Sequence, residues 1–202
     1  MWPVLCYQPP AMTSETLDKR TALLPRLLAN RPRVWRVGMV LLGSWLLAAS
    51  SWAEIPMVPV PMTLQTFALF VVAGLAGRYL TAAIVVVWLF QAAIGFPVLA
   101  GGAGGLDALT GPTAGFLVGM LAAGPIVGGF AETPRGWIAL TAMMLVGHAL
   151  VLGMGWAGLV LSGLEPANAF TGGVLPFLPG AAVKSLAAAL TVTLAQARLK
   201  AI

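Results

Sequence analysis

The chain consists of long apolar stretches that a few charged residues separate. Beyond Arg36, most charge-free stretches are between 13 and 29 residues long. A helix that crosses about 30 Å of hydrocarbon needs about 20 apolar residues. The spacing therefore predicts membrane-spanning helices joined by short charged loops. The separating charges are Glu54, Arg78, Asp107, Glu132 with Arg135, Glu165, Lys184 and Arg198.

The apolar stretches predict six transmembrane helices and a preceding tail. Residues 1–35 are basic and contain prolines, so we expect an N-terminal cytoplasmic tail there, followed by a six-helix membrane domain over residues 36–202. The predicted helices cover residues 37–53, 64–77, 80–96, 115–131, 136–161 and 180–198.

Composition narrows the class of protein. Hydrophobic residues make up 59% of the chain and charged residues 8%, whereas a soluble domain is about 25% charged. Disordered chains are excluded as well, because they are polar and rich in charge. We therefore expect an all-α polytopic membrane protein.

The distribution of basic residues predicts the orientation of the helices. The net charge is +5, and the basic residues gather in the tail, in alternate loops and at the C-terminus. Short loops rich in Lys and Arg stay in the cytoplasm. Both termini are therefore expected to be cytoplasmic, in the cell's inner (cytoplasmic) membrane. The same distribution argues against a nucleic acid partner and makes the lipid bilayer the natural environment.

Lys184 is the one cation that this topology places near the outer side. Its long side chain can snorkel to the outer interface and keep its ammonium in water. Alternatively, a cation within the membrane faces the interior of the bundle and pairs with an anionic ligand group. The position alone leaves both interpretations open.

Three other polar features invite a functional interpretation. Gln65 follows a proline-rich segment that is too apolar for an ordinary loop, and its carboxamide serves either a ligand or an interhelical hydrogen bond. The glycine-rich segment 101–115 lacks the Lys of a nucleotide-binding loop, so we expect it to approach a ligand or another helix closely. His148 is isolated, which favours a hydrogen-bonded interior residue over a metal ligand.

The sequence offers little support for catalysis. We find no nucleophile–base pair, no pair of carboxylates and no cofactor motif. No enzyme activity, cofactor or bound metal is expected. A binding or permeation protein is the better interpretation.

Four ordered motifs resemble the BioY family, the substrate-binding S components of energy-coupling factor (ECF) biotin transporters. The resemblance covers residues 37–200. The motifs run from Ile55 to Gln65, from Gly95 to Leu106, from Gly111 to Phe116, and from Val174 to Gly180 followed by Lys184.

The resemblance implies an S-component fold of six helices with a biotin cavity near the outer face. It implies high-affinity biotin uptake together with a transmembrane coupling subunit and two ATPase subunits, although some members are reported to work without these partners. The alternatives are an S component for another vitamin and a structural membrane protein that transports nothing.

The resemblance also suggests site residues. Gln65 and Lys184 match the family's pattern, so Lys184 is expected to hold the biotin carboxylate, and Asp107 is expected to supply polarity toward the ureido N–H groups. Ala103, Leu117 and Ala181 depart from the pattern, where some members carry Asn, Arg and Asp. The expected biotin-binding residues are Gln65, Gly102, Ala103, Gly104, Asp107 and Lys184.

Small residues along the first helix predict a docking face. A flat helix face lets a partner helix approach closely. The residues expected to dock the coupling subunit are Gly38, Gly43, Ser44 and Ala48.

Overall fold

The computed structural model describes residues 22–28, 31–133 and 135–200, and this part of the chain is mostly helical. Most of the predicted tail, residues 1–21 and 29–30, lies outside the described residues. The elements in order are α2 (Leu23–Leu27), α3 (Arg33–Trp52), β1 (Glu54–Ile55), β2 (Met62–Thr63), α4 (Gln65–Ala93), a 3₁₀ turn (Ala100–Gly102), α5 (Leu106–Thr110), α6 (Ala114–Ala131), α7 (Trp137–Leu161), α8 (Pro166–Gly173) and α9 (Phe177–Lys200).

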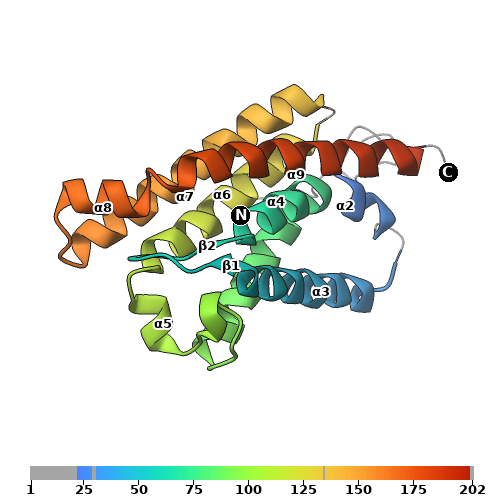
Figure 1. Ribbon diagram of the computed structural model, residues 1–202. Helices are drawn as coiled ribbons and strands as arrows, with labels where there is room; N and C mark the ends of the chain where they lie inside the picture. The colour runs from blue at the N-terminus through green and yellow to red at the C-terminus, as the bar shows by residue number, and fades with distance from the viewer. Residues whose placement is uncertain (1–21, 29–30, 134, 201–202) are drawn as a thin grey trace, which may run out of the picture.

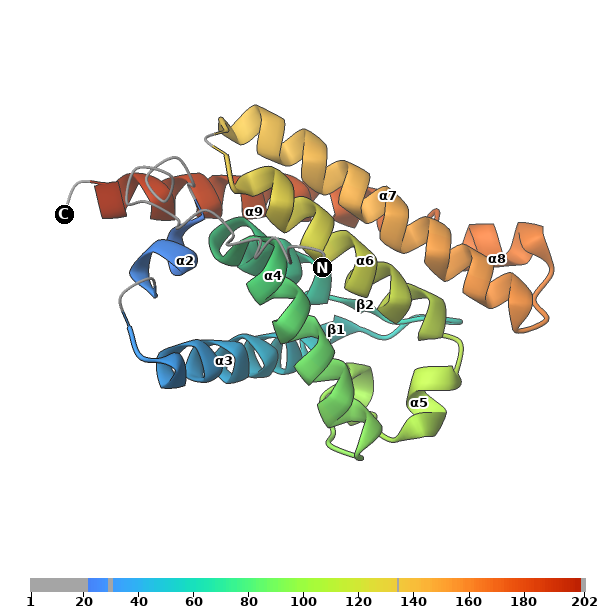
Figure 2. The ribbon, with the colours of Figure 1, turned by 180° about the vertical axis from the view of Figure 1, so that it is seen from behind.

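Within the described residues, five helices are long and apolar enough to cross a membrane: α3, α4, α6, α7 and α9. They pack into one bundle (Figures 1 and 2). In this bundle α4 lies against α3, α6 and α9, while α7 lies against α6 and α9. The chain therefore has the architecture of a multi-pass membrane protein.

The predicted second and third helices both correspond to α4, which begins at Gln65 and ends at Ala93. This element is interrupted at Gly77, whose backbone is not helical (φ 74°, ψ −177°). That conformation is essentially restricted to glycine. A Cβ there would also lie 2.9 Å from Glu132 Oε1 and 3.3 Å from Ala22 Cβ. The predicted break is thus present, and a count of six helices depends on counting the two halves of α4 separately.

Glycines bring α6 and α7 into close contact. A Cβ at Gly119 would lie 2.8 Å from Val151 Cα, and one at Gly158 would lie 2.8 Å from Gly115 Cα. Apolar helices in lipid associate through such close packing, because lipid tails leave no hydrophobic driving force between them. The tight α6–α7 pair forms one wall of the cavity described below.

Several predicted boundaries are corrected by the structure. The first long helix begins at Arg33 and not at residue 37, so Arg33 and Arg36 belong to this helix. The last helix begins at Phe177 and not at residue 180. Pro179 therefore lies in its first turn, where backbone N–H groups have no intrahelical acceptor and a proline costs little. The short elements α5, α8 and the β1–β2 hairpin were not predicted.

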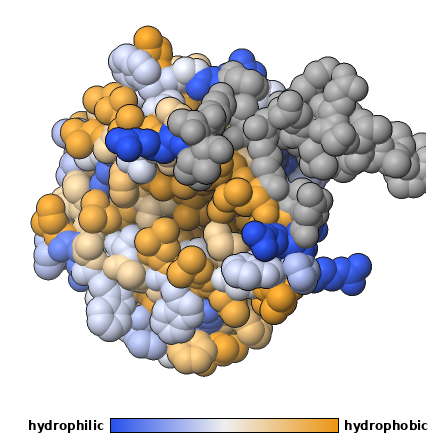
Figure 3. Space-filling model, turned by 90° about the vertical axis from the view of Figure 1, so that its right-hand side faces the viewer, coloured by the Kyte–Doolittle hydropathy of each residue, from blue (hydrophilic) through white to orange (hydrophobic). Residues whose placement is uncertain are grey.

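The charges separate to opposite ends of the bundle. Glu132 Oε1 accepts a hydrogen bond from the Arg78 backbone at the bend of α4, and Gln196 of α9 reaches Gly74 at the same end. Figure 1 places α2, the start of α3 and the end of α9 there, and Figure 3 shows its hydrophilic residues. We call this the arginine end. Its exposed arginines are Arg31, Arg33, Arg36, Arg78, Arg135 and Arg198.

The opposite end carries α5, α8, the hairpin and the beginning of α9 (Figure 1). Its acidic residues are Glu54, Asp107 and Glu165, and Lys184 is its basic residue. We call it the cavity end.

The predicted docking residues on α3 mostly face inward. Gly43, Ser44 and Ala48 are buried, and a Cβ at Gly43 would lie 2.6 Å from Ile84 Cδ1 of α4. Small side chains here let α3 approach α4, so their burial is at odds with an outer docking face. Gly38 is exposed, with no atom within 4 Å of a Cβ placed there.

Candidate functional site

A cavity of about 260 Å³ lies at the cavity end, between the hairpin, the glycine-rich loop and four long helices. The hairpin contributes Val60, Pro61 and Thr63 to its wall. Part of the proline-rich segment thus lines the cavity. Val60 is buried, whereas Val58 at the tip of the hairpin is 92% exposed.

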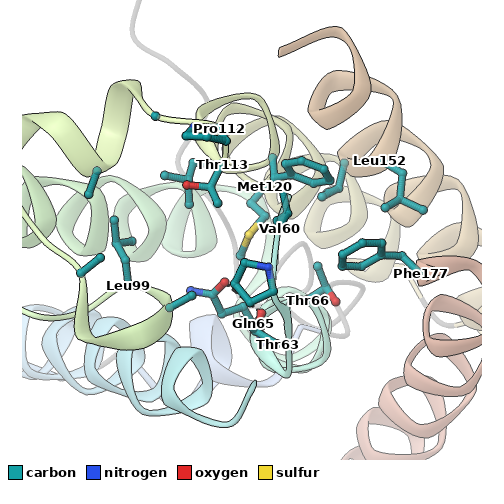
Figure 4. Close-up of a pocket in the computed structure, with 18 of the residues that line it drawn as sticks. Val60, Thr63, Gln65, Thr66, Leu99, Pro112, Thr113, Met120, Leu152 and Phe177 are labelled. Atoms are coloured by element: carbon teal, nitrogen blue, oxygen red, sulfur yellow. Dashed lines mark hydrogen bonds between the residues drawn. The ribbon is translucent and has the colours of Figure 1, made fainter. Parts of the chain in front are cut away.

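Most of the cavity wall is apolar. Figure 4 shows side chains from separate elements arranged around one space, among them Leu99 before the glycine-rich loop, Met120 of α6, Leu152 of α7 and Phe177 of α9. Phe116 of α6 lies beside Phe177 with ring centroids 6.2 Å apart. An apolar wall with few polar groups is typical of a site for a small organic ligand.

Lys184 lies on the cavity wall, two turns into α9. Its Nζ donates a hydrogen bond to the backbone oxygen of Thr63 at 2.6 Å. The side chain therefore faces the bundle interior, as the second interpretation of its sequence position requires. An ammonium has three N–H donors, so two remain to meet an anionic group in the cavity.

Gln65 lies at the start of α4 and is only 7% exposed. Its Oε1 accepts a hydrogen bond from Thr63 Oγ1 at 3.0 Å. Its Nε2 is buried and has no acceptor among the described residues. Because leaving a buried donor unpaired costs about 1–3 kcal/mol, this amide on a cavity wall is well suited to donate to a ligand.

Thr63 connects these two side chains. Its backbone oxygen accepts from Lys184 and its hydroxyl contacts Gln65. The hairpin thereby holds both polar groups beside the cavity. Thr63 was missed by the sequence analysis, although its place directly before the predicted helix that carries Gln65 was a usable signal.

The glycine-rich loop contributes unequally to the wall. Asp107 and Ala103 line the cavity, and both are exposed at its mouth. Gly102 and Gly104 do not line it. Gly104 instead packs against the backbone of Phe96 with no room for a Cβ, and Gly102 takes a positive φ of 72°. These two glycines shape the loop.

The positions that depart from the family pattern all line the cavity: Ala103, Leu117 and Ala181. Leu117 and Ala181 are buried apolar residues. This wall is thus less polar than it would be with Asn, Arg and Asp at these positions. Of the six predicted ligand residues, those with polar side chains on the wall are Lys184, Gln65 and Asp107.

His148 is a further cavity residue, on α7, and it is 4% exposed. Its Nδ1 lies 2.9 Å from Ser185 Oγ and 3.2 Å from Met144 O, and its Nε2 lies 3.0 Å from Thr66 Oγ1. The expectation of a hydrogen-bonded interior histidine is confirmed. Among the described residues there is no cluster of three or more His, Cys, Asp or Glu side chains that could hold a metal.

Comparisons with known proteins agree with this geometry. Residues 22–201 match the BioY family. The biotin transporter BioY of Rhodobacter capsulatus is 36% identical over an alignment of 166 residues, which covers 73% of this chain and 87% of the relative. The biotin transporter BioY of Thermotoga maritima is 30% identical over 145 residues, which are 72% of this chain and 86% of the relative.

A solved structure is similar as well. The crystal structure at 2.1 Å of the S-component for biotin from an ECF-type ABC transporter superposes with a TM-score of 0.73 and 26% sequence identity. The alignment covers 86% of this chain and 94% of the other. Since the family match spans nearly the whole described chain, this protein belongs to the BioY family.

Proposed function

We propose that this chain binds biotin and takes it up across the membrane as the S component of an ECF transporter. The observation that carries the proposal is the cavity of a BioY family member that holds Lys184 and Gln65 on a mostly apolar wall. The protein is accordingly a transport component and not an enzyme.

The chemistry of biotin fits the cavity. Biotin has an apolar bicyclic body, a ureido group and a valerate tail that ends in a carboxylate. Lys184 would hold the carboxylate through its two remaining N–H donors. Gln65 Nε2 would donate to the ureido oxygen, and Asp107 at the mouth would accept from a ureido N–H. The aromatic pair Phe116 and Phe177 would cover part of the bicyclic body.

We infer six crossings with both termini in the cytoplasm of the inner membrane. Exposed arginines gather at one end of the bundle and acidic residues at the other, which supports a cytoplasmic arginine end. On this topology the bend at Gly77 lies at the cytoplasmic face, and each half of α4 crosses from there toward the outer side. Biotin then enters the cavity from outside.

The ATP-driven step belongs to partners. This sequence has no Walker motif, and the similar solved structure is part of an ECF-type ABC transporter. We therefore propose assembly with a transmembrane coupling subunit and two ATPase subunits. Of the residues predicted to dock the coupling subunit, Gly38 is the one that stays accessible on α3.

Equilibrium binding of radiolabelled biotin to the purified protein tests the proposal. Biotin should bind tightly and stoichiometrically, and excess thiamine or riboflavin should not displace it. Displacement by thiamine or riboflavin would assign the cavity to another vitamin. This alternative is tested because the cavity wall departs from the family pattern at Ala103, Leu117 and Ala181. Absence of binding to any of the three would contradict the transport proposal.

A further inference from the structure

His148 connects three helices beside the cavity. Its ring contacts Ser185 of α9 through Nδ1 and Thr66 of α4 through Nε2, and it belongs itself to α7. Phe70 of α4 packs its ring edge-to-face with the imidazole, at 4.7 Å between centroids. Both ring nitrogens and the ring itself are therefore in contact with the protein.

The geometry assigns the ring proton. Nδ1 lies 3.2 Å from Met144 O, and a backbone carbonyl can only accept. From this contact we infer that Nδ1 carries the proton and shares it between Met144 O and Ser185 Oγ. In the neutral ring Nε2 then accepts from the Thr66 hydroxyl. The imidazole acts as a donor toward α9 and as an acceptor toward α4.

The two hydroxyl partners are sequence neighbours of the two polar cavity residues. Thr66 follows Gln65, and Ser185 follows Lys184. Consecutive residues of a helix differ by about 100° in direction, so a hydrogen bond that fixes Ser185 or Thr66 also fixes the rotation of its helix at the neighbouring residue. His148 thus links the helix turns that carry the carboxylate-binding and the ureido-binding groups.

A purely structural role explains this arrangement less well. Apolar residues of the same shape can replace a buried polar network with little loss of stability, or with a gain. The network also lies on the wall of the cavity, where Thr66 and His148 both line the space. Directional hydrogen bonds at this place fix the position of α4 relative to α9 more precisely than apolar packing does.

We propose that His148 is a positioning residue, which sets the placement of Lys184 through Ser185 and of Gln65 through Thr66. The inference rests on the proposed function, because it assigns one arm of the network to the ligand's carboxylate and the other to its ureido group. His148 acts through its neighbours and makes no direct bond to the ligand with its ring nitrogens.

The test compares biotin with biotinamide, in which a neutral amide replaces the carboxylate. The measured quantity is the discrimination ratio, the Kd of biotinamide divided by the Kd of biotin. Ser185→Ala and His148→Phe should each lower this ratio by roughly three- to tenfold, the value of about one hydrogen bond. Thr66→Val should weaken both ligands alike and leave the ratio unchanged.

Conservative variants and matched controls separate positioning from folding. His148→Asn keeps a donor near the Nδ1 position and should retain the ratio, whereas His148→Gln keeps a polar group near Nε2 and should lower it. Ser50→Ala and Thr191→Val remove hydroxyls that bond only within their own helices, and they should change neither Kd. Thermal unfolding followed by tryptophan fluorescence verifies that each variant is folded.

The outcomes are distinguishable. An unchanged ratio in folded Ser185→Ala and His148→Phe would overturn the positioning role, while tight biotin binding by the wild type would leave the proposed function intact. If Lys184→Met also left the ratio unchanged, the assignment of the carboxylate to Lys184 would fail together with the positioning role. No biotin binding by the wild type would overturn the proposed function itself.

Discussion

Among the described residues, each end of the bundle contains one half-buried residue of the minority charge, and the two make different contacts. Glu132 lies among the arginines, and its Oε1 accepts from the Arg78 backbone at the bend of α4. Lys184 lies at the end with the acidic residues, where its ammonium donates to one carbonyl and faces the cavity. The minority charge thus bonds to the protein backbone at the arginine end and faces the cavity at the cavity end.

This comparison predicts a separation of effects. Substitutions at the cavity end should change ligand binding more than stability, and those at the arginine end should do the reverse. Variants that break this pattern would show that the two ends are coupled through the helices between them.

The largest effect is expected for Lys184→Met, which removes the charge and keeps much of the apolar side chain. A hydrogen bond to a charged group contributes about 1.5–3 kcal/mol, so biotin affinity should fall by roughly 10- to 150-fold. Lys184→Ala should weaken binding at least as severely, with expression retained. Radiolabelled biotin binding measures both variants. Arg198→Met, a loss of charge at the arginine end, is the control and should bind as the wild type does.

The second prediction concerns the bend of α4. Gly77→Ala places a side chain in a conformation that only glycine tolerates, and 2.9 Å from Glu132 Oε1, so we expect a loss of about 1–3 kcal/mol in stability. Thermal unfolding of the detergent-solubilised protein detects it. Gly38→Ala, where no atom lies within 4 Å of the added Cβ, should be neutral or slightly stabilising. Equal midpoints for the two variants would contradict the interpretation of Gly77.

These two residues also show how far the sequence predicts the structure. The charge spacing located the helices well, and the break near residue 77 was predicted, because charges mark the ends of apolar stretches. Lys184 was singled out since it contradicted the charge pattern of the loops. The position of a charge relative to an apolar stretch is a local property, so it can be read from one sequence.

Other features depend on three-dimensional packing. Gly43, Ser44 and Ala48 form a small-residue face in the sequence, but the period of a pattern does not say whether the face meets a partner or the same chain's α4. His148 was recognised as an interior residue, yet its contacts with Thr66 and Ser185 span 82 and 37 residues along the chain. The residues near His148 in the sequence do not predict these contacts.

The third prediction is Gln65→Leu, which removes the unpaired Nε2 donor from the cavity wall. One hydrogen bond between neutral groups contributes about 1 kcal/mol, so affinity should fall roughly fivefold. Biotin and biotinamide should be affected alike, because the ureido group is common to both. Gln91→Leu is a matched control, a buried glutamine on the same helix that does not line the cavity. Equal losses in both glutamine variants would indicate a packing effect.

The smallest effect is expected at Glu132, the residue at the arginine end that was compared with Lys184. If this residue serves as a hydrogen-bond acceptor for the Arg78 backbone, Glu132→Gln keeps an oxygen in place and should cost about 0.5 kcal/mol or less. Glu132→Ala loses the acceptor and should cost about 1 kcal/mol. Both variants should bind biotin with wild-type affinity in the same assay used for Lys184. Equal losses for Glu132→Gln and Glu132→Ala would mean that the charge itself is required at the arginine end, since the glutamine preserves the hydrogen-bond acceptor and removes only the charge.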